Sequence, residues 1–158
     1  MSIPRSIHVI TLFLFAGLVL TASPTRNETS RVLTLKGSAK HCSVPPDFAI
    51  SDGKGLSPAQ KQFLGFFSGY WAGKLYHTLL VAEISKDGTV SAYYAHEAYG
   101  PWKIPQPNCS RVKGKLENGV LTLKWSSVVV RYEFSDSDTL KGEYNKRNRI
   151  TPGTFKRQ

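Results

Sequence analysis

Cysteine is scarce in this chain of 158 residues, which contains only Cys42 and Cys109. No Cys-x-x-Cys pair and no cluster of cysteine with histidine occurs, so no zinc site built on these residues is expected. We predict neither a metal site nor a cofactor. Because an even number of cysteines in an exported chain favours pairing, we predict a disulfide between Cys42 and Cys109.

Acidic residues are outnumbered, with 11 Asp and Glu against 21 Lys and Arg and a formal net charge of +10. The basic residues are spread over many segments, with a local excess only in residues 141–157. No nucleic-acid-binding motif accompanies this charge, so we predict no nucleic-acid partner. An anionic surface or a protein partner stays open.

Long hydrophobic runs are missing except at the N-terminus, where an apolar stretch covers residues 7–20. Arg5 precedes this stretch and the small residues Thr21-Ala22-Ser23 follow it. This order is typical of a secretory signal peptide, and the stretch is short for a bilayer span. We therefore predict a signal peptide at 1–23, a secreted or periplasmic location, and no transmembrane span after cleavage.

The rest of the chain divides into an arm and one domain. Residues 24–56 are rich in proline and glycine and have little apolar periodicity, which predicts an extended N-terminal arm. Residues 57–158 form the predicted domain. It opens on a short helix, since Ser57 suits the N-cap, Pro58 the first helical position and Gln60 the capping box.

From Tyr70 onward, apolar and polar residues alternate between turn signals, which predicts an antiparallel meander. The predicted turns lie at 86–88, 118–119, 126–127 and 136–138, and the three later hairpins agree on one apolar face. The predicted inward pairs are Leu116–Leu121, Gly114–Leu123, Val112–Trp125, Trp125–Val128, Leu123–Val130, Leu121–Tyr132, Phe134–Leu140, Tyr132–Gly142 and Val130–Tyr144. On the outer face the predicted pairs include Lys113–Lys124, Glu133–Lys141 and Arg131–Glu143.

The earlier hairpin, with Gly88 in a left-handed conformation, is predicted to direct three pairs inward, namely Ile84–Val90, Ala82–Ala92 and Leu80–Tyr94. With residues 70–76 as the first strand and 150–156 as an edge or irregular strand containing Pro152, about eight strands result. We predict an all-β fold: an antiparallel up-and-down meander that closes into a small barrel.

Gly69-Tyr70-Trp71, placed straight after the short helix, resembles the Gly-x-Trp motif of lipocalins and related calycins. In that family the tryptophan closes one end of the barrel, commonly against a basic residue near the last strand. The resemblance implies that Gly69 and Trp71 form the barrel-closing motif. It makes Lys146, Arg147 and Arg149 candidates for the basic residue.

Catalytic motifs are also missing: no Gly-x-Ser-x-Gly elbow, Ser/His/Asp series or paired carboxylates occur. His77 opposite His96, with Glu97 adjacent, would place metal-ligand types at one barrel mouth, but this pairing requires a four-residue loop. The register with better alternation places His96 across from Thr78 and turns His77 outward. We therefore predict a non-enzymatic protein.

The predicted interior is aromatic and suits a small apolar or aromatic ligand. Two functions stay open: a ligand-binding module, or a structural or protein-interaction module whose barrel is filled by side chains. Trp102 lies on a long predicted loop, residues 97–109, between the third and fourth strands, and is expected either to contact a ligand or to cover a barrel end. The candidate ligand-binding residues are Tyr94, His96, Trp102, Trp125, Tyr132 and Tyr144.

Overall fold

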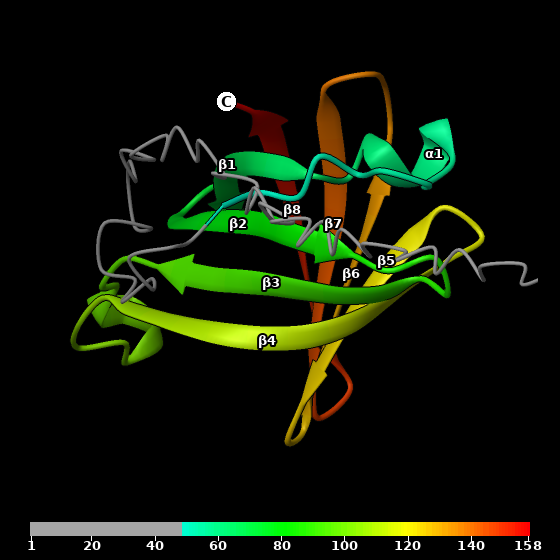
Figure 1. The fold of residues 1–158 in the computed structure, drawn as a ribbon. Helices are drawn as coiled ribbons and strands as arrows, with labels where there is room; N and C mark the ends of the chain where they lie inside the picture. Colours follow the sequence, from blue (N-terminus) through cyan, green and yellow to red (C-terminus); the bar gives the residue numbers. More distant parts are fainter. Residues whose placement is uncertain (1–48) are drawn as a thin grey trace, which may run out of the picture.

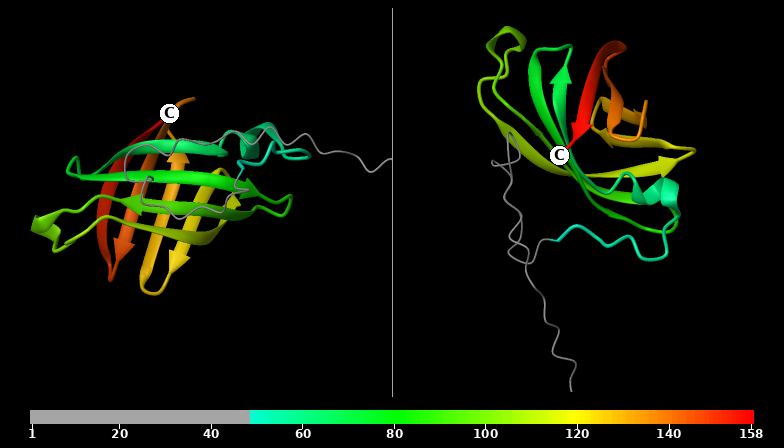
Figure 2. Two further views of the ribbon diagram at one scale, coloured as in Figure 1. Left: turned by 60° about the vertical axis from the view of Figure 1, so that its left-hand side comes forward. Right: turned by 90° about the horizontal axis from the view of Figure 1, so that it is seen from above.

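The computed structural model describes residues 49–158, in which eight antiparallel strands form a closed barrel (Figure 1). Each strand pairs with the next, and β8 returns to pair with β1, as the two views in Figure 2 show. The predicted all-β up-and-down barrel is confirmed. The predicted signal peptide, most of the predicted arm and Cys42 lie outside the described residues. The strands are β1 (Gly65–Trp71), β2 (Leu75–Ile84), β3 (Thr89–His96), β4 (Asn108–Glu117), β5 (Val120–Trp125), β6 (Val128–Phe134), β7 (Thr139–Lys146) and β8 (Arg149–Arg157).

Helical structure in the described part is limited to short segments. The helix α1 (Pro58–Lys61) is one turn long, and a 3-10 turn, η2 (Gly100–Trp102), lies in the β3–β4 loop. The Ser57 hydroxyl accepts from the Gln60 N–H at 3.2 Å, and the Gln60 side chain accepts from the Ser57 N–H at 3.0 Å. This capping box satisfies two N–H groups at the start of α1. No helix within residues 49–158 has the length and apolar character needed to cross a membrane.

The predicted register of the later hairpins is confirmed from β5 to β7. Asn118 and Gly119 have φ angles of 51° and 77°, the left-handed pair that a type I′ turn needs. The predicted pairs of β5 with β6 and of β6 with β7 are all present. The β4–β5 ladder runs from Glu117–Val120 to Gly114–Leu123, so it ends short of the predicted Val112–Trp125 and Lys113–Lys124 pairs.

The β2–β3 hairpin differs from the prediction at one residue. Its loop, the left-handed Gly88 (φ 83°) and the Ile84–Val90 pair are as predicted. The register then shifts between Val81 and Glu83, where a β-bulge places one extra residue in β2. The predicted pairs Ala82–Ala92 and Leu80–Tyr94 and the predicted opposition of His96 to Thr78 are therefore wrong. The observed pairs are Val81–Ala92, Leu79–Tyr94, Thr78–Ala95 and His77–His96.

The predicted first strand is wrong, whereas the predicted last strand at 150–156 is present as β8 but is not an edge strand. Residues 70–76 do not form one strand, because the chain turns at 72–74 between β1 and β2. β8 is not an edge strand, because it pairs with β7 on one side and with β1 on the other. Pro152 is tolerated because it lies just beyond the ladder with β1, which ends at the Trp71–Gly153 pair.

The end of the barrel next to α1 is filled by aromatic side chains. The Phe63 and Phe134 rings are 4.8 Å apart, and the Arg157 guanidinium lies 4.7 Å from the centre of the Phe67 ring. Arg157 also donates to the carbonyl oxygens of Gln62 and Leu64 behind α1. The basic residue that covers this end is therefore Arg157, which lies over Phe67. Among residues 49–158, the cation–π contacts found place no basic residue over Trp71.

The outer face of β2 and β3 carries a second apolar cluster of Leu80, Ala82 and Tyr93. Ile50 packs against this cluster, and the N–H of Ser51 donates to the Ala82 carbonyl at 2.8 Å. The last residues of the predicted arm thus lie against the barrel. Because this segment covers the outer face of β2, the strand can carry apolar side chains on both of its faces.

Candidate functional site

A cavity of about 390 Å³ opens at the end of the barrel opposite α1. β1 leads from α1 at Gly65 to Trp71, and Trp71 lines the cavity. The other walls come from the ends of β3, β5 and β7, the beginnings of β2, β4 and β8, and the loop before β4. The aromatic walls are Trp71, Tyr94, Trp102, Trp125 and Tyr144, the aliphatic ones Leu75, Ile104 and Val112, and the polar ones His96, Asn108, Ser110, Lys146 and Thr151.

Five of the six predicted ligand-binding residues line this cavity, namely Tyr94, His96, Trp102, Trp125 and Tyr144. The sixth, Tyr132, does not; it is fully buried in the middle of β6, below the cavity. Trp102 contacts Tyr99 edge-on at 5.3 Å and forms part of the wall that the long loop contributes. The aromatic walls of the site thus come from four strands and one loop.

Trp71 forms the inner end of the cavity and is only 1% exposed. Its ring lies 4.8 Å from that of Phe155. Gly142 and Gly153 face each other across β7 and β8, and a Cβ on either would come within 3 Å of the Trp71 ring. Glycine at these two positions therefore makes room for an aromatic ring. The indole Nε1 of Trp71 has no hydrogen-bond partner among residues 49–158.

Gly69, the other residue of the predicted barrel-closing motif, lies on the seam between β1 and β8, opposite Phe155. A Cβ at this position would lie 1.9 Å from the carbonyl oxygen of Thr154. Glycine is therefore required for the two backbones to approach where the barrel closes.

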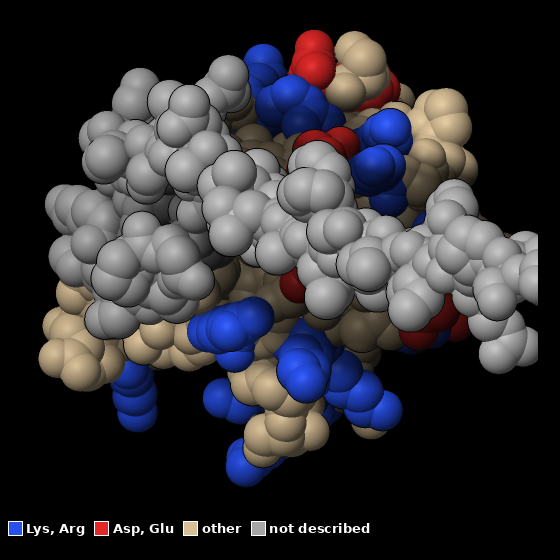
Figure 3. All heavy atoms as spheres, in the orientation of Figure 1, with Lys and Arg blue, Asp and Glu red and all other residues tan. Residues whose placement is uncertain are grey.

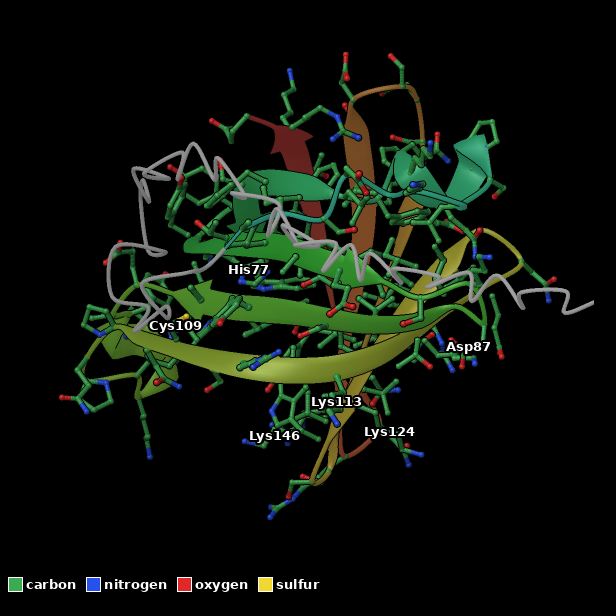
Figure 4. All side chains as sticks on the ribbon, viewed as in Figure 1. His77, Asp87, Cys109, Lys113, Lys124 and Lys146 are labelled. Atoms are coloured by element: carbon green, nitrogen blue, oxygen red, sulfur yellow. The ribbon has the colours of Figure 1, made fainter. Side chains whose placement is uncertain are left out.

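His77, predicted to face outward, is fully buried, and its ring centre lies 5.5 Å from that of Trp71. Figure 4 labels His77 on the ribbon. Its Nδ1 lies 2.6 Å from the Ala95 carbonyl and its Nε2 lies 2.9 Å from the Tyr132 hydroxyl. Desolvation by burial lowers the pKa of His77 to about 3, so the ring is neutral. Because a carbonyl only accepts, Nδ1 carries the proton, and Nε2 accepts from Tyr132.

The His77–His96 pairing, which the predicted register excludes, does form. Both ring nitrogens of His77 are nevertheless engaged, and Nδ1 of His96 lies 3.0 Å from the carbonyl of Glu97. In the part of the chain that the structure describes, no three His, Cys, Asp or Glu side chains lie together as metal ligands would. Leu75, His77 and Leu79 alternate along β2 and point to the same face. This alternation predicts the inward orientation of His77 only when the bulge at Ala82 is taken into account.

The hydroxyl groups of the cavity are neutral at physiological pH. Burial raises the pKa of Tyr94 well above its usual value, and it also raises that of the half-buried Tyr144. Lys146, which is exposed at the mouth, is the only cavity-lining residue among residues 49–158 with a full charge. The cavity walls therefore combine aromatic and aliphatic side chains with several polar ones, and a single ammonium group lies at the entrance.

Comparison of the sequence with protein-family models finds no match, and neither does comparison with curated proteins. The fold itself defines the class: an eight-stranded antiparallel up-and-down β-barrel, filled at one end and open at the other. This architecture is consistent with a lipocalin-like fold.

Proposed function

We propose that this protein is an exported, non-enzymatic, lipocalin-like module that binds a small apolar or aromatic molecule at the open end of its barrel. The observation that carries the proposal is the 390 Å³ cavity with five aromatic walls. Small-molecule sites are typically concave, about 300–1,000 Å³ in volume, and mostly apolar with a few polar groups. The N-terminal signal pattern supports export.

The distribution of side chains favours this function over that of a barrel filled throughout. Phe63, Phe67 and Phe134 fill the end next to α1. At the other end, glycine at positions 142 and 153 lets Trp71 lie deep in the interior, and the space above Trp71 is open. A module acting only through its outer surface has no physical need for such a cavity.

Intrinsic fluorescence tests the proposal directly, because all three tryptophans of the chain, Trp71, Trp102 and Trp125, line the cavity. Titration with a panel of fatty acids and small aromatic molecules is expected to change the emission saturably for at least one member. Filling the cavity by Val112→Phe is expected to abolish this change.

Val129→Phe, on the outer face of β6, makes the same substitution away from the cavity and is expected to leave binding intact. Unchanged emission with every member of the panel would refute the proposal. Equal binding to the wild type and to the folded Val112→Phe variant would refute the location of the site.

A further inference from the structure

The open end of the barrel is strongly basic. Its turns and adjoining strand ends hold five cationic residues against one acidic residue, Glu97, a net charge of +4. The closed end is mixed, since the turns there include Asp87, Asp136 and Asp138. The five cationic residues at the open end are Lys74, Lys103, Lys146, Arg147 and Arg149.

Only one of these cations belongs to the cavity wall. Lys146 is the last residue of β7 and lines the mouth, and Arg147 follows it in the turn to β8. Among residues 49–158, no acidic residue lines the cavity, and the ion pairs Lys115–Asp87 and Arg157–Asp138 do not involve Lys146. Figure 4 shows Lys146 below β4, and Figure 3 shows Lys and Arg dominating the lower part of the same face.

In the described part of the chain, the inner end of the cavity holds no counter-charge, and its one unpartnered donor is the indole N–H of Trp71. His77 is held neutral between the Ala95 carbonyl and the Tyr132 hydroxyl, and the other groups there are aromatic. An ionised group buried at this depth would lose its hydration without gaining a counter-charge, which is costly. A charged ligand group must therefore stay at the mouth, where the field of the basic residues attracts an anion and repels a cation.

We propose that the cavity binds small aromatic carboxylates, with the ring between the aromatic walls and the carboxylate at the mouth beside Lys146. The proposal rests on the proposed function, because it names the chemical class of the ligand at that same site. A flat ring suits the aromatic surface formed by Trp71, Tyr94 and Trp125, because the Tyr94 and Trp125 rings contact each other, with centroids 4.9 Å apart, and form one continuous wall. Electrostatic complementarity then selects the sign of the substituent.

Three ligands with the same ring test the inference: 2-naphthoate, 2-naphthalenemethanol and 2-naphthylmethylammonium, titrated into the full mature chain by calorimetry at low salt. We expect 2-naphthoate to bind roughly threefold to tenfold more tightly than the alcohol, and the ammonium to bind most weakly. Raising the salt concentration is expected to reduce the difference between the carboxylate and the alcohol, because the ion pair is exposed to solvent.

Variants separate Lys146 from the general positive charge. Lys146→Gln is expected to weaken 2-naphthoate binding about threefold and to leave the alcohol unchanged. Lys113→Gln removes an exposed charge from β4 outside the cavity and is the matched control, expected to change neither ligand.

Equal binding of the carboxylate and the alcohol, or a Lys146→Gln variant that binds both as the wild type does, would overturn this inference and leave the proposed function standing. If none of the three ligands binds while a member of the fatty-acid and aromatic panel still changes the tryptophan emission, this inference fails and the proposed function stands. If no member of the panel binds either, both fail.

Discussion

The hydroxyl oxygen of Tyr132 lies 2.9 Å from Nε2 of His77, with both side chains fully buried. The bond joins β6 to β2 across the barrel interior, and the Nδ1–H of the same imidazole bonds the Ala95 carbonyl of β3 at 2.6 Å. Three strands are thus connected through one neutral histidine. This polar connection lies between the filled end of the barrel and the open cavity.

Removing the hydroxyl should destabilise the barrel. In Tyr132→Phe, Nε2 of His77 is left buried without a donor, and we expect a loss of about 1–3 kcal/mol in the free energy of unfolding. Urea denaturation measures this loss. Tyr70→Phe, at a ring that is 49% exposed, is the matched control and should cost far less. Equal effects of the two substitutions would contradict the role assigned to the bond.

The free energy of unfolding should decrease as the pH is lowered, because His77 is buried in its neutral form. Its pKa is about 3 in the folded chain against 6.5 for the free side chain, so the unfolded state takes up the proton first as the pH falls. The contribution is fully present above pH 6.5 and is lost as the pH falls toward 3. Between pH 7 and pH 4.5 the free energy of unfolding should decrease by about 2.5 kcal/mol.

Urea denaturation at a series of pH values measures this slope. His77→Gln should flatten it, whereas His96→Gln should preserve it. Two exposed carboxyls, Asp87 and Asp136, do not interfere with this measurement. Local hydrogen bonds, first those from the backbone N–H groups of Thr89 and Asp138, lower the pKa of these carboxyls below 3.8. The stability that they contribute is therefore lost only below the pH range used for His77. If His77→Gln shows the same dependence of unfolding free energy on pH as the wild type, the dependence arises from the titration of another group.

The sequence predicts the barrel best where each strand has one polar face. From Leu121 to Tyr144 the alternation fixes the register, because a slip of one residue would bury charges such as Arg131 and Glu133. β2 gives no such signal, since Leu80 and Ala82 are buried outside and Leu79 and Val81 inside. A bulge in a strand that is apolar on both faces leaves no trace in the pattern.

The same bulge explains what the sequence could and could not show of the site. Tyr94, Trp125 and Tyr144 lie on strands whose inward faces were predicted correctly, and they reach the cavity. His77 lies beyond the bulge, so its predicted orientation was inverted. Tyr132 does face inward, but depth along the strand decides whether an inward residue meets the cavity, and alternation carries no information on depth.

Export and the disulfide are open to direct measurement. Expression of the full chain in an exporting host should give a product whose N-terminus follows residue 23, as Edman sequencing would show. Thiol titration of the denatured product should find no free thiol, because Cys42 and Cys109 are predicted to pair. Two titratable thiols per chain would refute the disulfide, and a product that retains residues 1–23 would refute cleavage.

Alanine at Gly142 or Gly153 should destabilise the barrel by overpacking it. The new Cβ would lie 2.7 Å from the Phe155 ring at position 142 and 2.6 Å from both the Trp71 and Phe155 rings at position 153. Such contacts force the rings to move, at a cost of about 1–3 kcal/mol in the free energy of unfolding. Because Trp71 forms the inner end of the cavity, the emission of the folded variants should change as well.

Gly100→Ala provides the matched control, since a Cβ at Gly100 in η2 would meet nothing within 4 Å. Denaturation of the three variants, with ligand titration of the folded fraction, separates two roles for the glycines. If Gly142 and Gly153 serve only to bend their strands, alanine should cost no more there than at Gly100 and ligand affinity should be retained. If Gly142 and Gly153 are needed to make room for the Trp71 ring, alanine should lower both stability and ligand affinity, because a displaced indole changes the shape of the cavity.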